Sequence, residues 1–467
     1  MIGQDKFDRF LKKFPHDHRT FFNRPHWTRR QFFQVAGAGI TGSILAERYA
    51  RADDLSSAGV SPHNTARNVI FILLAGAPSH TDTFDLKMVD GITPTSFAPE
   101  TVKGILWPTG LLPNLGQNFA NGDFTIVRSM RAWALVHSLA QTWTQIGRNP
   151  AAALGNIAPN IGSVVAIEKE KERHAGQVFP TFLALNSNGA AGPGYFPAVY
   201  APFKVSPNTK GITNTTSPAG QARFNNRWSL MHSLDDNLRV NSPDGKAMED
   251  YDDFYSSAEG LMYNPAVNQA FAFSADDSAR YGNTSLGNAC LVAHHVLLAD
   301  QGTRFVQITS SDGWDMHQNI YSPTALPAKG KILDNAVSAL LNDLKASGQL
   351  DSTLVVMAGE FGRTVGKLSA AAGRDHYVQQ FVFFAGGGVQ GGRTIGITND
   401  QGSDVTDFGW SRDRYIRPED VEATIYSAVG IDWTTVRRDD PFGRGFEYVP
   451  FSEQNLYGPI DELWTPA

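Results

Sequence analysis

Short apolar runs alternate along the chain with longer amphipathic segments. Six apolar, partly β-branched runs have the pattern of buried strands: residues 68–74, 124–127, 179–185, 305–309, 354–358 and 381–385. Helical periodicity or a helix-start signal marks the segments between them: residues 137–147, 156–174, 286–300, 327–347 and 418–429. This alternation predicts an α/β fold with a doubly wound, mostly parallel sheet.

The composition changes between residues 186 and 277, where Asn, Ser, Gly and Pro dominate. We expect a loop-rich insertion or cap there, covering the sheet edge and setting substrate specificity. Residues 53–67, rich in Ser, Asp and Asn, are expected to be a linker. The main domain is expected over residues 68–450, followed by a C-terminal tail over 451–467.

The first 52 residues have the features of an export signal. Arg29 and Arg30 precede a weakly apolar run of about twelve residues (35–46), and Ala50-Arg51-Ala52 has the small-x-small pattern of a signal-peptidase site. The run is too short to span a bilayer as a stable anchor. A twin-arginine signal predicts a protein of the periplasm or cell envelope. The alternative is an amphipathic N-terminal helix that leads into the fold.

Composition excludes several classes of protein. The 467 residues are 42% hydrophobic and 18% charged, with a net charge of −6, as in an ordinary globular protein. No basic stripe with interleaved aromatic residues is present, so nucleic acid is not an expected partner. The single cysteine, Cys290, lies in an apolar helical segment, where we expect it buried. It can form neither a disulfide within the chain nor a zinc site with two thiolates.

One glycine-rich segment matches the dinucleotide-binding fingerprint only in its letters. Gly386, Gly388 and Gly391 have the required spacing, but the residues that follow are β-like. The fingerprint needs a helix N-terminus to bind the pyrophosphate. We therefore expect a glycine hairpin here rather than a dinucleotide site.

Polar side chains follow four of the expected strands. They are Asp82 after 68–74, His137 and Ser138 after 124–127, Asp315 and His317 after 305–309, and Glu360, Arg363, Asp375 and His376 after 354–358. Strand ends of a doubly wound sheet share one edge, so these groups are expected to converge. Carboxylates and imidazoles without thiolates suit Zn²⁺ or Mn²⁺, and one or two such ions would polarise an ester oxygen.

The same residues also have structural interpretations. Glu360 and Arg363 could pair with each other to fix a loop, and His376 could simply pack beside them. Asp82 is a good turn residue, and Ser138 is a good N-cap for the helix that starts there.

Several motifs together resemble one bacterial family. LLAGAPSHTDTFDLK, HSLAQTWTQIG, SDGWDMHQN, MAGEFGRT and GRDHY occur in order, and the chain over about residues 65–450 resembles the exported family catalogued as domain of unknown function 1501. That family is grouped with the alkaline phosphatase and sulfatase superfamily. The resemblance implies an α/β fold with metal ligands at strand ends.

The resemblance also implies roles for single residues. Asp315 and His317 would hold one metal, Glu360 would stand for the first acid of an Asp-His ligand pair, and His376 for the late histidine. The nucleophile position falls on His137 or, one residue on, Ser138. The chain departs from the superfamily pattern at Phe361, which replaces the second member of the ligand pair, and at the imidazole in the nucleophile position.

These observations predict an exported, metal-dependent hydrolase of phosphate or sulfate esters, acting on a small anionic ester or an envelope glycan. The expected metal ligands are Asp82, Asp315, His317, Glu360 and His376. His137 or Ser138 would attack the ester or position water, Arg363 would neutralise the anion, and Asp375 would assist beside His376. The alternative is a non-catalytic binding or structural protein of the cell envelope on the same fold.

Overall fold

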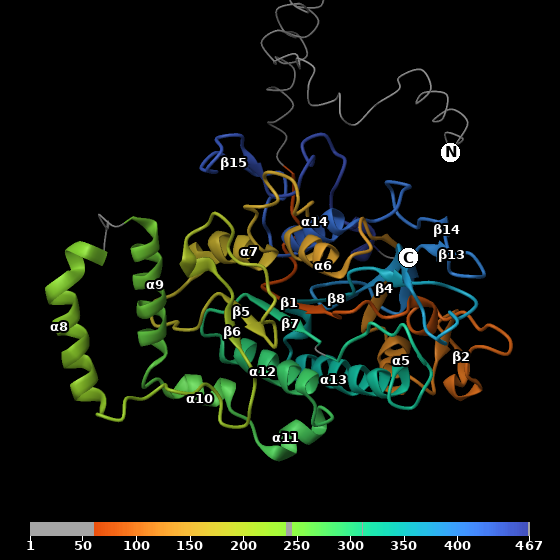
Figure 1. Ribbon diagram of the computed structural model, residues 1–467, viewed down its shortest axis with the longest axis horizontal. Coiled ribbons are helices and arrows are strands. Elements are labelled where there is room, and N and C mark those ends of the chain that lie inside the picture. Colours follow the sequence, from red (N-terminus) through yellow and green to blue (C-terminus); the bar gives the residue numbers. More distant parts are fainter. Residues whose placement is uncertain (1–59, 240–244, 311, 466–467) are drawn as a thin grey trace, which may run out of the picture. The chain divides into compact units, whose positions relative to one another are not determined.

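The computed structural model describes residues 60–239, 245–310 and 312–465 (Figure 1). Residues 61–467 belong to one compact unit of the chain. The predicted export signal and the first half of the predicted linker lie outside the described residues, so both remain predictions.

An eight-stranded sheet forms the centre of this unit. Its strands are β1 (Asn68–Leu73), β4 (Phe124–Arg131), β5 (Phe182–Leu185), β6 (Phe203–Val205), β7 (Phe305–Thr309), β8 (Thr353–Ala358), β11 (Gln379–Ala385) and β12 (Arg393–Ile395). Their order is β12-β4-β11-β8-β1-β7-β5-β6. Only β11 runs antiparallel to its neighbours β4 and β8, and the other described pairs of this sheet are parallel. The predicted mostly parallel α/β sheet is confirmed.

Helices cover both faces of the sheet, because successive side chains of a buried strand point to opposite faces. In β1, Ile70 and Ile72 join the core on the side of α12 (Ser285–Ala299) and α13 (Leu326–Ala346). Val69 and Phe71 join the core on the side of α7 (Ile161–Lys169) and α14 (Pro418–Ala428). Figure 1 shows these two helical layers on opposite sides of the strands.

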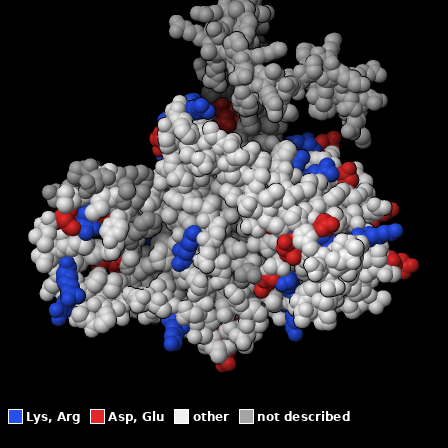
Figure 2. All heavy atoms as spheres, in the orientation of Figure 1, with Lys and Arg blue, Asp and Glu red and all other residues white. Residues whose placement is uncertain are grey.

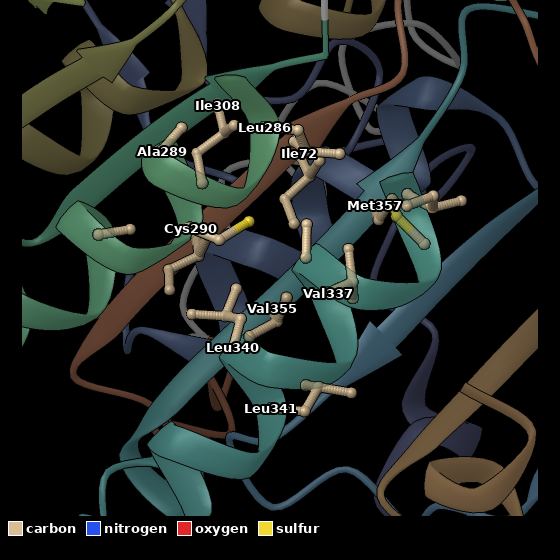
Figure 3. Close-up of a cluster of buried hydrophobic side chains, with 14 of the residues drawn as sticks. Ile72, Leu286, Ala289, Cys290, Ile308, Val337, Leu340, Leu341, Val355 and Met357 are labelled. Carbon is tan, nitrogen blue, oxygen red and sulfur yellow. The ribbon is translucent and has the colours of Figure 1, made fainter. Parts of the chain in front are cut away.

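Figure 3 shows the core beneath α12 and α13. Side chains from both helices meet Ile72, Ile308, Val355 and Met357 of three adjacent strands. Cys290 lies in this cluster and is fully buried, as predicted. Burial raises the pKa of its thiol to about 12, so Cys290 acts as a small apolar side chain.

Two predicted boundaries move inward, and proline accounts for both. The helix predicted over 156–174 begins only at Ile161, where the side chain of Asn160 caps it by accepting from the Gly162 N–H. Pro159 precedes that cap and disfavours helical backbone before it. The strand predicted from residue 179 begins at Phe182, because Pro180 has no N–H to donate to the sheet.

The stretch predicted as a loop-rich insertion is more helical than its composition suggested. It contains α8 (Gln221–Arg239), α9 (Lys246–Leu261), α10 (Pro265–Phe271) and α11 (Ala275–Arg280). Much of the Asn, Ser, Gly and Pro lies before, between or at the starts of these helices, where caps and turns use it. In Figure 1, α8 and α9 stand apart from the sheet.

The remaining regular elements are short. They are α5 (Pro113–Asn121), α6 (His137–Ile146), β2 (Pro99–Val102), β3 (Ile105–Pro108), β9 (Gly362–Arg363), β10 (His376–Tyr377), β13 (Ile397–Thr398), β14 (Val405–Asp407), β15 (Val436–Arg437) and β16 (Phe446–Glu447), with six 3₁₀ turns among the described residues. A strand, β12, follows Gly386, Gly388 and Gly391, where the dinucleotide fingerprint would need a helix. The predicted glycine hairpin is wrong, because β12 pairs in parallel with β4 and does not pair with the preceding strand β11. The antiparallel pair β9–β10 sets His376 opposite Arg363.

The visible surface carries scattered charges of both signs. Figure 2 shows Lys and Arg interspersed with Asp and Glu on this face, without a continuous basic stripe. Within the part of the chain that the structure describes, each helix is too short or too polar to cross a membrane.

Candidate metal centre

The predicted convergence takes place at one edge of the sheet. Strands β1, β4, β7 and β8 all end there, and antiparallel β11 begins there. His137 is the first residue of α6, Asp315 and His317 follow β7, and His376 lies in β10. One side-chain nitrogen or oxygen from each of these four residues lies within 4.8 Å of the other three. We call these four residues the metal centre.

The distances within the metal centre are those of a closely packed ligand set. His317 Nε2 lies 2.9 Å from Asp315 Oδ1 and 3.1 Å from His376 Nε2. His137 Nε2 lies 3.3 Å and His376 Nε2 3.6 Å from the same oxygen of Asp315. All three imidazoles therefore present the same nitrogen, Nε2, to one carboxylate oxygen.

A hydrogen-bond acceptor occupies the other nitrogen of each imidazole. Nδ1 of His137 donates to Glu360 Oε1 at 2.6 Å, and Nδ1 of His317 donates to Asp375 Oδ1 at 2.8 Å. Nδ1 of His376 donates to the backbone carbonyl of Leu135 at 2.7 Å. Such partners fix the tautomer of a metal-binding histidine and increase its basicity. In neutral imidazoles, they direct the Nε2 lone pairs at the centre, where Arg363 Nη1 lies 3.5 Å from Nε2 of His317.

This donor set fits a divalent cation. Without a cation, unprotonated nitrogens and a carboxylate oxygen would face one another, which is unfavourable. His137 Nε2 is also a buried atom without a hydrogen-bond partner among the described residues. Three imidazoles and one carboxylate are ligands typical of Zn²⁺, and other first-row divalent ions accept them. The metal centre has the size of a site for one ion.

Glu360, predicted as a ligand, lies outside the four residues of the metal centre. This buried side chain accepts hydrogen bonds from His137 Nδ1, from the Gly76 N–H at 2.9 Å and from Gln141 Nε2 at 2.9 Å. Glu360 therefore contacts one residue of the metal centre, His137, and holds its imidazole in place. Gly76 is required for this contact: its φ is +102°, and a Cβ there would lie 2.7 Å from the backbone nitrogens of both Trp314 and Asp315.

Replacing Glu360 with Gln tests this supporting role. We expect Glu360→Gln to weaken metal affinity by about 10–100-fold without abolishing it, as for other outer partners of metal ligands. Isothermal titration with Zn²⁺ measures the effect. Complete loss of binding in a folded variant would show that Glu360 is itself a ligand, as the sequence predicted.

Arg363, predicted to neutralise the anion, contacts protein groups in the structure. Its guanidinium is buried and donates to the backbone carbonyls of Ala77 and Arg374, at 2.9 and 3.2 Å, and to Asp315 Oδ1 at 2.6 Å. Arg363 therefore positions Asp315. Partial burial of Asp315 acts to raise its pKa, but the hydrogen bond and charge of Arg363, with His137, lower it below its usual value. Asp315 is thus kept ionised for a cation.

Asp82, also predicted as a ligand, lies outside the metal centre in a separate ion pair with Arg374. Its Oδ2 accepts from Arg374 Nε and Ser79 Oγ, both at 2.6 Å, and its Oδ1 accepts from Tyr321 at 2.7 Å. Asp82 and Arg374 are fully buried. Because Arg374 immediately precedes Asp375 and His376, this ion pair anchors the segment that delivers them.

The ion pair of Asp82 predicts a large stability effect. Asp82→Ala would leave Arg374 buried without its partner, and we expect a loss of about 3–5 kcal/mol in the free energy of unfolding. Urea denaturation measures it, and Asp90→Ala, at an exposed carboxylate, is the matched control with an effect within about 0.5 kcal/mol. A loss of metal without a loss of stability would restore Asp82 as a ligand.

The two remaining predicted residues lie at the periphery. Ser138 is exposed, as the second residue of α6, and the N-cap position belongs to Val136, which makes no side-chain cap. Among the described residues, no contact of the Ser138 side chain therefore supports its interpretation as a nucleophile or as an N-cap. Asp375, with its side chain largely exposed, accepts from His317 and has the position of a ligand-orienting group.

An open cleft of about 300 Å³ lies beside the metal centre. His137 and Asp315 form one wall, and Gln141, Thr309 and Ser310 also line it. The side chains of the metal centre are between 25% and 42% exposed. The metal centre is therefore accessible from the cleft.

Sequence reasoning missed two supporting groups, the side chain of Gln141 and the carbonyl of Leu135. Gln141 follows His137 by four residues on α6, so the helical repeat places both on one face. That spacing was a usable signal. The backbone carbonyl of Leu135 had no signal in the sequence, because every residue has a backbone carbonyl.

The described fold is similar to several solved structures, at low sequence identity. A sulfatase from a Pseudoalteromonas species aligns at a TM-score of 0.36 and 12% identity, covering 82% of this chain and 70% of that one. A protein of the alkaline phosphatase superfamily from Vibrio parahaemolyticus aligns at a TM-score of 0.36 and 12% identity, and the alignment covers 80% of this chain and 69% of that one. An alkaline phosphatase from the Antarctic bacterium TAB5 aligns at a TM-score of 0.33 and 15% identity, and the alignment covers 70% of this chain and 93% of that one.

No curated protein matches the chain. One family model does match, over residues 66–449, and this confirms the resemblance in the sequence motifs. The chain belongs to the family described as protein of unknown function DUF1501.

Proposed function

We propose that this protein is a metal-dependent hydrolase of phosphate or sulfate esters. The observation that carries the proposal is the shared arrangement of the three histidines. Each has its Nδ1 engaged by an acceptor, and each directs its Nε2 at Asp315. When bound there, a divalent ion would supply a Lewis acid that polarises an ester oxygen.

The protein's own residues then have defined tasks. His137, His317, His376 and Asp315 hold the ion. Arg363 keeps Asp315 ionised and in place. Because His137 Nε2 faces the other ligands, His137 is occupied as a ligand and does not attack the ester. The attacking group in this proposal is water, admitted through the cleft lined by Gln141, Thr309 and Ser310.

A structural metal site is the second candidate, and the number of ligands favours it. Structural zinc sites are typically closed by four protein ligands, whereas catalytic zinc sites keep one position open. The metal centre offers four ligands. The exposure of these side chains and the adjacent cleft support a catalytic site more strongly, because a closed structural site needs no route for substrate.

Turnover by the metal-loaded full-length protein separates the two candidates. The substrates are aryl phosphate monoesters and diesters, an aryl sulfate and an aryl phosphonate, each assayed with Zn²⁺ and with Mn²⁺. We expect hydrolysis of at least one class, lost on chelation and restored by the ion. A stoichiometric metal without turnover, combined with a large loss of stability on chelation, would establish the structural site.

We further propose that the protein is exported through the twin-arginine route, on the evidence of Arg29, Arg30 and the apolar run after them. Replacing both arginines with lysine should leave the precursor in the cytoplasm. Cell fractionation measures this, and Arg9→Lys is the matched control. Unchanged arrival of the double variant in the envelope would refute the route.

A further inference from the structure

A second pocket, of about 460 Å³, lies on another side of α6. The tryptophans Trp133 and Trp143 line it, together with Glu419 at the start of α14 and the chain segments 148–155 and 445–457. Its volume falls within the range of about 300–1,000 Å³ typical of ligand pockets. No residue of the metal centre contributes to it.

Aromatic rings form much of its wall. The rings of Trp133 and Trp143 are stacked, with centroids 6.1 Å apart and planes 24° apart. Tyr457 and Phe451 also line the pocket. Trp133 is 44% exposed and Phe451 is 57% exposed, so the pocket has an accessible aromatic rim. Exposed aromatic side chains of this size commonly mark recognition sites.

The two tryptophans are fixed before any ligand arrives. Their indole N–H groups donate to the two oxygens of Glu419, at 3.0 and 2.9 Å, and Glu419 is buried. Burial raises the pKa of Glu419 to about 7, against the effect of the two indole hydrogen bonds. The guanidinium of Arg417 lies 3.8 Å from the ring centre of Trp133. Pre-organised rings of this kind lose little entropy on binding.

Groups of both charges lie among the aromatic rings. Arg148 lines the pocket. Its Nη2 donates to the backbone carbonyls of Glu447 and Tyr448, and its Nε is buried without a hydrogen-bond partner among the described residues. Glu419 and Glu447 contribute carboxylates and Asn149 an amide. A purely apolar ligand would leave the Nε of Arg148 without a partner, which is costly. A strongly charged ligand, whether anionic or cationic, would lie close to pocket groups of its own sign as well as to groups of the opposite sign.

A sugar ring suits both the aromatic and the polar parts of this wall. Its C–H face is apolar and stacks on an indole, while its hydroxyls both donate and accept hydrogen bonds. We propose that the pocket lined by Trp133 and Trp143 is a saccharide-binding site that receives a pyranose ring.

The saccharide site is separate from the metal centre. Trp143 follows His137 by six residues on α6, which corresponds to about 9 Å along the helix axis and roughly 240° around it. Saccharide binding should therefore be independent of the metal, and the proposal stands whether or not the protein hydrolyses esters.

Binding of neutral oligosaccharides to the full-length protein tests the proposal. The probes are cellohexaose, maltohexaose, chitohexaose and mannohexaose, followed by tryptophan fluorescence and calorimetry. We expect at least one to bind, with Kd raised tenfold or more in Phe451→Ala and in Trp133→Ala. Trp133→Phe, which keeps a ring but loses the N–H, should lose less. Tyr255→Ala, at an exposed aromatic residue of α9, is the matched control with unchanged Kd.

Three results would overturn the proposal. The first is no binding of any of the four hexasaccharides at millimolar concentration. The second is binding that Phe451→Ala and Trp133→Phe leave unchanged. The third is displacement of the bound saccharide on chelation of the metal, or its loss in His317→Ala, since either would place the saccharide at the metal centre. Phe451 is exposed, so its variant remains informative if Trp133→Ala fails to fold.

Discussion

The purified protein is expected to bind one equivalent of Zn²⁺, and His317→Ala is expected to lose it. His317 Nε2 lies closest to the other ligands, 2.9 Å from Asp315 and 3.1 Å from His376. Loss of an outer partner typically weakens metal affinity by about 10–100-fold, so loss of this ligand should cost at least about 100-fold. The ligands left behind would face one another around a weakly held ion.

Elemental analysis and Zn²⁺ titration of the two proteins measure this effect. His174→Ala is the matched control, because His174 is an exposed histidine remote in sequence from the metal centre. Chelation should lower the melting temperature of the wild type and leave that of His317→Ala unchanged. Wild type that contains well under one equivalent of metal, and takes up neither Zn²⁺ nor Mn²⁺, would contradict the metal centre.

The second large effect is expected at the start of α6, where the sequence left His137 and Ser138 as alternative nucleophiles. His137 Nε2 lies 3.3 Å from Asp315 and its Nδ1 is bound to Glu360, so we expect it to be a metal ligand. His137→Ala should then lower both metal affinity and turnover by at least about 100-fold. Ser138→Ala should leave both nearly unchanged, because its side chain is exposed.

Excess metal distinguishes a ligand from a nucleophile. If His137 binds the ion, raising the Zn²⁺ concentration should restore part of the turnover of His137→Ala, because occupancy recovers. If His137 attacks the ester, the metal occupancy of His137→Ala should recover while its turnover stays low. Abolished turnover in Ser138→Ala at full metal occupancy would instead identify Ser138 as the nucleophile and contradict our assignment of water.

The five predicted metal ligands show how much the position of a residue after a strand can predict about its contacts. Asp315, His317 and His376 were predicted as ligands because they follow buried strands, and the structure brings all three together. Asp82 and Glu360 were predicted on the same ground, but Asp82 pairs with Arg374 and Glu360 binds His137. A strand end fixes the sheet edge at which a residue lies. It does not fix which neighbour the side chain meets.

The amino-acid sequence by itself determined six of the eight strands of the central sheet, the layers and the sheet edge at which the candidate site residues lie. Runs such as 68–74 and 305–309 are apolar on both faces, and only a sheet covered on both sides buries them. The tertiary structure alone decided which polar side chains share one point in space. His137 and His376 lie 239 positions apart in the chain, and their meeting depends on loop paths and on close backbone approaches such as that of Gly76 to Asp315. Periodicity is a local property of the chain, whereas a ligand set is a sum of contacts between distant segments, so only the folded chain specifies it.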